Sequence, residues 1–246
     1  SDETVEVHNS ETIREAANSF PSGTSIGLDT WTFKDIAAAE GNDLDKLAII
    51  MCKFQREVAP PQQCLAQLLN LLGKKGGGNR TVSTMPTLYR ILTRLESSTD
   101  RDWNRAAAHA DDSAKPETSC LRAAEERLVE QELLHLQGIP AVITLWDITK
   151  FYDSPLQYDI LAQRCIEEEY GLLKTSLTMI VHAAPRVLKI GKALGNMLPS
   201  VGRGIVAGCG RSQSFARCYT NKSVDTLRQS SAINHHHGLN VSGIRV

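Results

Sequence analysis

Residues 141–153 have the sequence AVITLWDITKFYD. The apolar and β-branched residues at 141–148 predict a buried β-strand that brings Asp147 to its carboxyl end, and Pro155 then begins a predicted helix. An ionised carboxylate is costly to bury unless it is paired or binds a metal, so Asp147 is a candidate ligand for Mg²⁺. For this strand taken alone, an aspartate that caps a helix or lies on the surface is the more ordinary explanation.

The composition indicates a folded protein rather than a disordered one. The chain has 246 residues, of which 41% are hydrophobic, enough for one large domain or two small ones. No apolar run approaches the roughly 20 residues that span a bilayer, and the acidic first residues argue against a signal peptide. The six cysteines form no CxxC pair, which favours reduced thiols in an intracellular protein of the nucleus or cytoplasm.

Charge is distributed unevenly along the chain. Residues 171–246 contain ten Lys and Arg and a single acid, Asp225, although the net charge of the whole chain is −1. A basic segment on an acidic chain favours a surface that binds a polyanion, and a solvated basic face explains the same pattern about equally well.

Periodicity and turn residues predict a mixture of helices and strands. Residues 63–84 predict a strand, a glycine-rich hairpin tip and a return strand. Residues 96–118 are polar and predict a loop or an inserted segment, residues 174–182 fit a helix or a strand, and residues 191–203 predict irregular structure. Helices are predicted over residues 11–20, 31–40, 44–57, 85–95, 120–137, 155–170 and 212–228.

Four segments together resemble the reverse transcriptases of non-LTR-type retroelements, in particular dinoflagellate-like ones. Residues 145–153 resemble the first palm motif, an Asp-ended strand followed by an aromatic residue. GLDTWT at 27–32 is similar to a Gly-x-Asp-Gly-Trp stretch, and KKGGGNRTVSTMPTLYR at 74–90 resembles the fingers segment. GIVAGC at 204–209 resembles the Gly-Val-Pro-Gln-Gly-Ser motif, so the resemblance spans roughly residues 25–220.

The resemblance implies roles for residues near the predicted metal site. Asp147 corresponds to the catalytic metal ligand, and Ile148 would offer its backbone carbonyl to the same Mg²⁺. Tyr152 matches the aromatic residue that packs against the incoming sugar and excludes a 2′-hydroxyl. Gly208 matches the glycine that lets the backbone approach the template base pair.

The glycine-rich segment would bind the nucleotide triphosphate. Lys74, Lys75 and Arg80 match the cations of the fingers, and a glycine hairpin that carries cations can close over phosphates. A solvated surface turn is the alternative explanation. A P-loop is a poor one, because no Gly-Lys-Ser/Thr begins a helix here.

The sequence departs from the family pattern at three places. Thr81 stands where the family has proline, and Ala207 stands where it has glutamine. The third palm motif, a Tyr/Phe-x-Asp-Asp hairpin due soon after residue 240, is absent, so the chain is expected to be truncated before it. The site would then lack its second principal carboxylate.

The resemblance therefore predicts an α+β fold, a partial right-hand polymerase with an antiparallel sheet covered by helices. Residues 1–118 would form the N-terminal segment and fingers, and residues 119–246 a partial palm. The implied function is RNA-directed DNA synthesis from an RNA template, a DNA primer and dNTPs, with Mg²⁺ and without a membrane. This polypeptide is expected to be inactive. A non-catalytic nucleic-acid-binding remnant is the alternative, and an unrelated structural or interaction protein is a third class.

Overall fold

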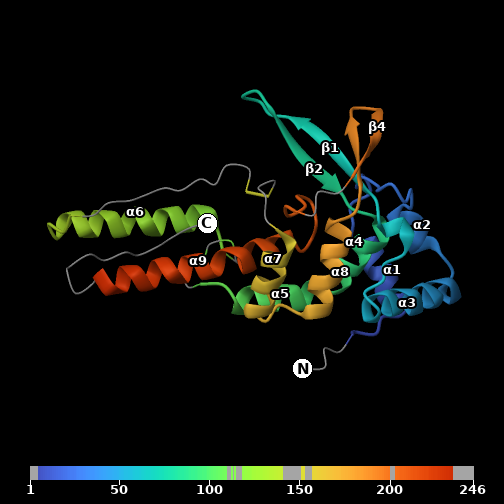
Figure 1. Ribbon diagram of the computed structural model, residues 1–246, viewed down its shortest axis with the longest axis horizontal. Helices are drawn as coiled ribbons and strands as arrows, with labels where there is room; N and C mark the ends of the chain where they lie inside the picture. Colours follow the sequence, from blue (N-terminus) through green and yellow to red (C-terminus); the bar gives the residue numbers. More distant parts are fainter. Residues whose placement is uncertain are drawn as a thin grey trace.

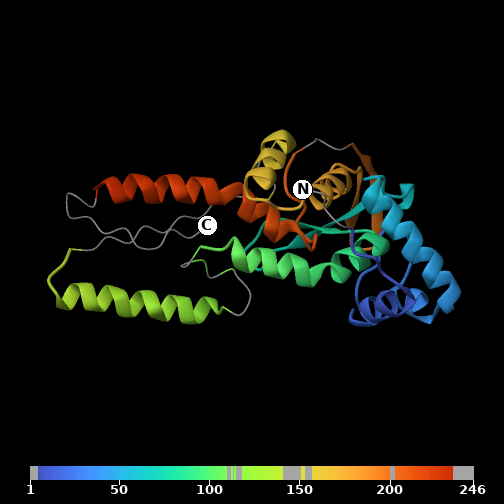
Figure 2. The same ribbon diagram turned by 90° about the horizontal axis from the view of Figure 1, so that it is seen from below.

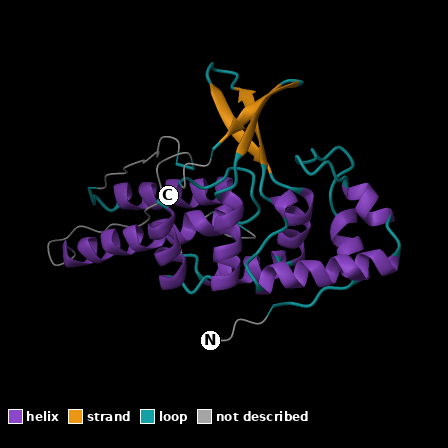
Figure 3. Ribbon diagram, turned by 45° about the vertical axis from the view of Figure 1, so that its right-hand side comes forward, coloured by secondary structure: helices purple, strands orange, loops and turns teal. Residues whose placement is uncertain are grey.

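A four-stranded sheet projects from a body of helices, with its hairpin tips pointing away from that body (Figure 1, Figure 3). The computed structural model describes residues 5–109, 112, 114, 118–140, 151–152, 157–199 and 203–234, with the backbone alone at 228 and 230–234. Helices on one side and one four-stranded sheet on the other are consistent with the predicted α+β class.

Three helices form the N-terminal part of the body: α1 (Ser10–Asn18), α2 (Phe33–Ala38) and α3 (Gly41–Arg56). The predicted helices at 11–20, 31–40 and 44–57 are thus confirmed. Asn9 and Thr32 begin α1 and α2 through capping boxes, in which each side chain accepts a backbone N–H of the first turn. Apolar side chains of these helices share one core with those of the helix at 87–95: Ile13, Ile36, Leu44, Met51, Ile91 and Leu92.

The sheet contains β1 (Gln67–Gly73), β2 (Asn79–Thr84), β3 (Arg186–Ile190) and β4 (Ala193–Leu198), in the order β2-β1-β3-β4. A short 3-10 helix, η1 (Gln62–Cys64), precedes β1. The first hairpin, β1–β2, confirms the strand, tip and return strand predicted from the sequence. The sheet is mixed rather than antiparallel, because β1 and β3 run parallel between two antiparallel pairs.

The second hairpin, β3–β4, corrects the prediction of irregular structure at residues 191–203. Gly191 makes the turn with a φ of 61°, and β4 then pairs back onto β3. The sequence gives little sign of β4, since its apolar side chains do not alternate with polar ones. Leu194, Met197 and Leu198 are all exposed.

The prediction of a loop over residues 96–118 is wrong for its first half. After α4 (Thr87–Leu95), the chain forms a second helix, α5 (Ser97–Ala106). The buried residues of α5 are polar, namely Asp100 and Asn104. Hydrophobic periodicity cannot detect a helix that packs through polar side chains, so this helix was missed.

α6 (Cys120–Leu136) confirms the predicted helix but not its burial. Ala123 is its one buried residue, and the leucines at 121, 128, 133 and 136 are exposed. In both views α6 extends away from the sheet, to the same side as the far end of the last helix (Figure 1, Figure 2).

A second core lies between three helices of the C-terminal half: α7 (Tyr158–Glu167), α8 (Leu172–His182) and α9 (Ser212–Asn234). These confirm the helices predicted at 155–170 and 212–228, and α8 decides the segment at 174–182 in favour of a helix. The core residues come from α7, α9 and the loops beside them: Leu161, Cys165, Tyr170, Ile205, Phe215 and Cys218.

The strand predicted at 141–148 lies outside the described residues, as do residues 235–246. Strands from both sides of residue 118 share one sheet, since β1 pairs with β3. No helix among the described residues is long and apolar enough to cross a membrane. The six cysteines, all in described segments, form no disulfide, and four of them are buried.

Candidate nucleic-acid interface

The cations of the fingers-like segment lie on the exposed first hairpin. Lys74 and Lys75 occupy its tip, and Arg80 lies on β2 opposite Leu72 of β1. The tip is closed by a backbone bond from Lys74 N–H to the Gly78 carbonyl, 3.0 Å long. Gly77 and Gly78 have φ values of 90° and 77°, which explains the glycine run. All three cations are exposed, as a phosphate-binding role requires.

Gly208 occupies a place that no other residue fits. Its φ is 107°, and a Cβ atom added to it would lie 2.3 Å from the carbonyl oxygen of Ser83 on β2. Next to it, the Ser83 N–H donates to the Ala207 carbonyl at 2.8 Å. The glycine therefore lets the loop at 203–210 approach the edge of β2, which is a close backbone approach within the protein itself.

Tyr152 contacts the same loop near its beginning, at Ile205. Its carbonyl accepts the Ile205 N–H at 2.9 Å, and its side chain is 36% exposed. The ring packs edge-on against Phe151, with centroids 5.5 Å apart. The loop at 203–210 thus contacts both Tyr152 and β2, the strand that carries Arg80, although these are far apart in the sequence.

The segment at 27–32 packs onto the start of α4, directly after the first hairpin. Asp29 accepts the Thr87 N–H through Oδ2 at 2.5 Å, and the Thr87 hydroxyl donates to the Trp31 carbonyl at 2.7 Å. A Cβ on Gly27 would lie 2.9 Å from the Met85 carbonyl oxygen. Thr30 has a φ of 58° at the position where the family-like pattern has glycine. Two segments recognised by resemblance are therefore direct neighbours.

Burial affects the carboxyl group in this contact. Desolvation raises the pKa of Asp29 above its usual value, and hydrogen bonds from the backbone at Thr87 and Leu88 oppose that rise. The carboxylate lies at the N-terminus of α4, where the helix dipole also favours a negative charge. Its contacts are those of a helix cap.

Asp147 and Ile148, the two residues expected to hold Mg²⁺, lie outside the described residues. Within the part of the chain that the structure describes, no three His, Cys, Asp or Glu side chains gather closely enough to hold a metal ion. The metal site thus remains a prediction from the sequence.

The two hairpins of the sheet carry positive charge and no acid of their own. Residues 67–84 and 186–198, which form both hairpins, contain six Lys and Arg and no Asp or Glu. Arg80 pairs with Leu72 and Lys189 with Asn70, so the alternation of side chains places both cations on one face. Lys192 adds an exposed cation at the second tip. This acid-free sheet is the strongest candidate surface for a polyanion.

Several cations of the basic segment after residue 171 are ion-paired within the protein. Arg211 and Arg217 are buried, and each forms ion pairs within the protein. Arg217 binds Asp112 at 2.7 Å, and Lys222 reaches Glu167 at 3.3 Å. Arg211, Arg217 and Lys222 thus neutralise acids of the protein itself, and the polyanion surface expected from this segment stays a prediction for its other cations.

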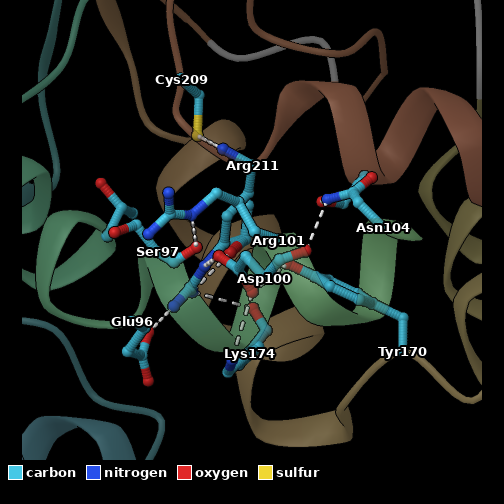
Figure 4. Close-up of polar contacts among 12 residues, drawn as sticks. Glu96, Ser97, Asp100, Arg101, Asn104, Tyr170, Lys174, Cys209 and Arg211 are labelled. Atoms are coloured by element: carbon cyan, nitrogen blue, oxygen red, sulfur yellow. Dashed lines mark hydrogen bonds and ion pairs between the residues drawn. The ribbon is translucent and has the colours of Figure 1, made fainter. Parts of the chain in front are cut away.

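Arg211 lies at the centre of a buried polar cluster that the sequence did not predict. Figure 4 shows Glu96, Asp100 and Lys174 gathered around its guanidinium group. Arg211 pairs with Glu96, its Nε lies 3.4 Å from Asp100 Oδ2, and Lys174 Nζ lies 3.1 Å from Asp100 Oδ1. Tyr170 also donates to Asp100, at 3.2 Å. Acids in a predicted loop and cations in a basic segment were the available signal for this cluster.

Burial dominates the protonation equilibria of this cluster. Desolvation raises the pKa of Asp100, and the charge of Lys174 opposes that rise. Desolvation also raises the pKa of Tyr89 well above its usual value, and Tyr89 bonds to Thr178 at 3.1 Å and contacts Cys209 Sγ at 3.4 Å. The neutral phenol therefore joins α4 to α8 and to the loop at 203–210.

Comparison with known proteins adds no relative. No protein-family model matches this sequence, and a search of curated proteins finds no match.

Proposed function

We propose that this chain is the fingers region and part of the palm of a reverse-transcriptase-type polymerase, and that it binds an RNA template with a DNA primer. The acid-free sheet is the observation that carries the proposal. The two hairpins carry six cations and no acid, so they attract the phosphates of a nucleic acid. This attraction does not depend on the base sequence of the nucleic acid. The first hairpin, with Lys74, Lys75 and Arg80, would make the principal contacts.

The neighbourhood of the hairpin supports this choice over a solvated basic turn. The loop with Gly208 lies against β2, Tyr152 is hydrogen-bonded to that loop, and the segment at 27–32 caps the helix after β2. An isolated surface turn requires none of these contacts. These contacts join segments that were identified by the family resemblance, and they support the proposal independently of the charge of the sheet.

Polymerisation would need Mg²⁺, which Asp147 and the Ile148 carbonyl would hold. Bound there, the metal would neutralise charge on the phosphates of the incoming nucleotide. Tyr152 would limit the space for a 2′-hydroxyl. The 246 residues contain no Tyr/Phe-x-Asp-Asp, so this polypeptide would bind template–primer without extending it. That outcome also describes the alternative function, a non-catalytic nucleic-acid-binding protein.

Binding of a fluorescent RNA–DNA template–primer by the whole chain tests the proposal. The triple variant K74Q/K75Q/R80Q removes three exposed cations from the first hairpin. We expect its affinity to fall at least about tenfold, and the slope of log K against log salt to become shallower by about 2–3.

The matched control is K34Q/K46Q/K53Q, which removes three exposed cations from α2 and α3. It makes the same change in net charge at a place outside the sheet. The control variant should keep an affinity close to that of the unmodified chain. Equal losses in the two triple variants, or no binding at low salt by the unmodified chain, would contradict the proposal.

A further inference from the structure

Among the described residues, Arg211 is the largest side chain that is completely buried, with 0% of its surface exposed. It receives two carboxylates from the junction of α4 and α5, and its Nη1 donates to Thr178 Oγ1 of α8 at 3.0 Å. A buried guanidinium is tolerated only where its donors are bound by acids and oxygens of this kind. Such a site fixes the position of the backbone that carries it.

The backbone in question is the end of the loop at 203–210. Arg211 follows Gly208, Cys209 and Gly210, and its own N–H approaches Cys209 Sγ at 3.4 Å. The next residue, Ser212, donates its hydroxyl to the Val206 carbonyl at 2.5 Å and so closes the loop. Any change in the place of Arg211 is transmitted to Gly208 through two residues.

The opposite side of the loop depends on that placement. The Ser83 N–H reaches the Ala207 carbonyl at 2.8 Å, and Gly208 passes the Ser83 carbonyl with no room for a Cβ atom. A fit this close tolerates little displacement. The loop is therefore held between a hydrogen bond to the sheet and an ion-paired side chain in the helical body.

We infer that Arg211 is a positioning residue, whose ion pairs with Glu96 and Asp100 set the register of the loop at 203–210 against β2. The inference rests on the proposed function in one respect, because the loop is proposed to lie at the template–primer site. Lysine cannot replace arginine here, since one ammonium group cannot reach two carboxylates and a hydroxyl in the fork geometry of a guanidinium.

Hydrogen exchange of single amides tests this role in the whole chain without nucleic acid. The reporter is the Ser83 amide, which bonds to the loop, and the reference is the Gln67 amide, which bonds to the Pro185 carbonyl at the base of the sheet. In Arg211→Lys we expect Ser83 to exchange at least about tenfold faster relative to Gln67. Glu96→Gln should shift Ser83 in the same direction, and adding it to Arg211→Lys should have little further effect.

The matched control is Arg217→Lys in α9, six residues after Arg211. Arg217 is also buried and ion-paired, but its partners are Asp112 and Asn104 rather than the junction of α4 and α5. A general loss of stability would accelerate Ser83 and Gln67 together in both variants. Where Arg211→Lys does not fold, Asp100→Asn serves in its place.

Faster exchange of Ser83 in Arg211→Lys alone supports the positioning role. Unchanged exchange there, or an equal effect in Arg217→Lys, overturns it. Failure of the unmodified chain to bind template–primer would instead overturn the proposed function, and the two results are independent.

Discussion

The Cα of Gly208 passes the carbonyl of Ser83 so closely that a Cβ atom would lie 2.3 Å from its oxygen. We expect Gly208→Ala to lower the free energy of unfolding by about 2–4 kcal/mol, because it adds both this overlap and strain at a φ of 107°. Chemical denaturation measures the change. In the control Gly195→Ala, the nearest backbone atom would lie 3.6 Å away, so the change should stay within about 0.5 kcal/mol.

Thr30 is held at a φ of 58°, a conformation that β-branched residues rarely adopt. Thr30→Gly should therefore stabilise the protein by about 0.5–1 kcal/mol. This value is the backbone strain that is relieved, reduced by the larger conformational entropy that glycine has in the unfolded chain. Ser22→Gly, a replacement at an exposed turn residue without positive φ, should not stabilise. A loss of stability in Thr30→Gly would show that the threonine side chain contributes more than its backbone costs.

His182 makes stability depend on pH. Burial first, and then the charge of Arg186, lower its pKa from 6.5 to about 3. The folded protein keeps this side chain neutral while the unfolded chain takes up a proton, so stability is full above pH 6.5 and falls as the pH decreases towards 3. Between pH 7 and pH 5 we expect a loss of about 2 kcal/mol from this residue.

His182→Leu should remove that part of the pH dependence. Among the described residues, neither ring nitrogen of His182 has a hydrogen-bond partner. Replacement by leucine therefore deprives no other buried group of a hydrogen bond. The measurement is urea unfolding at pH 5, 6 and 7, with His135→Leu on the exposed face of α6 as the control. The same slope in His182→Leu as in the unmodified chain would contradict the assignment.

Primer extension should be undetectable for this 246-residue polypeptide with Mg²⁺ and dNTPs. The reason is that the sequence supplies Asp147 but no Tyr/Phe-x-Asp-Asp, whereas two-metal nucleotidyl transfer needs further carboxylates. The assay compares the unmodified chain with Asp147→Ala. Incorporation that depends on Mg²⁺ and disappears in Asp147→Ala would show that another carboxylate completes the site.

Sequence reasoning succeeded where local signals were strong. The glycine run at 76–78 predicted the tip of the first hairpin, where Gly77 and Gly78 have positive φ, and hydrophobic periodicity predicted the helices α1, α2 and α3. It failed for α5, whose buried face is formed by Asp100 and Asn104, because a polar face that is satisfied by distant partners looks like a loop.

The candidate site shows the same division. Exposure of the hairpin cations followed from the glycine-rich sequence, and it was predicted. The inward orientation of Arg211 and Arg217 could not be predicted, because it depends on acids more than 100 positions away in the chain. Charge counted along a sequence gives no information about which cations are already paired.

Lysine footprinting by acetylation and mass spectrometry tests the central claim most directly, since it reports which surface template–primer covers. We predict that bound template–primer protects Lys74, Lys75 and Lys192 of the two hairpin tips at least about threefold, and leaves Lys34, Lys46 and Lys53 reactive. Equal reactivity of all six lysines with and without bound template–primer, or protection confined to α2 and α3, would contradict the account.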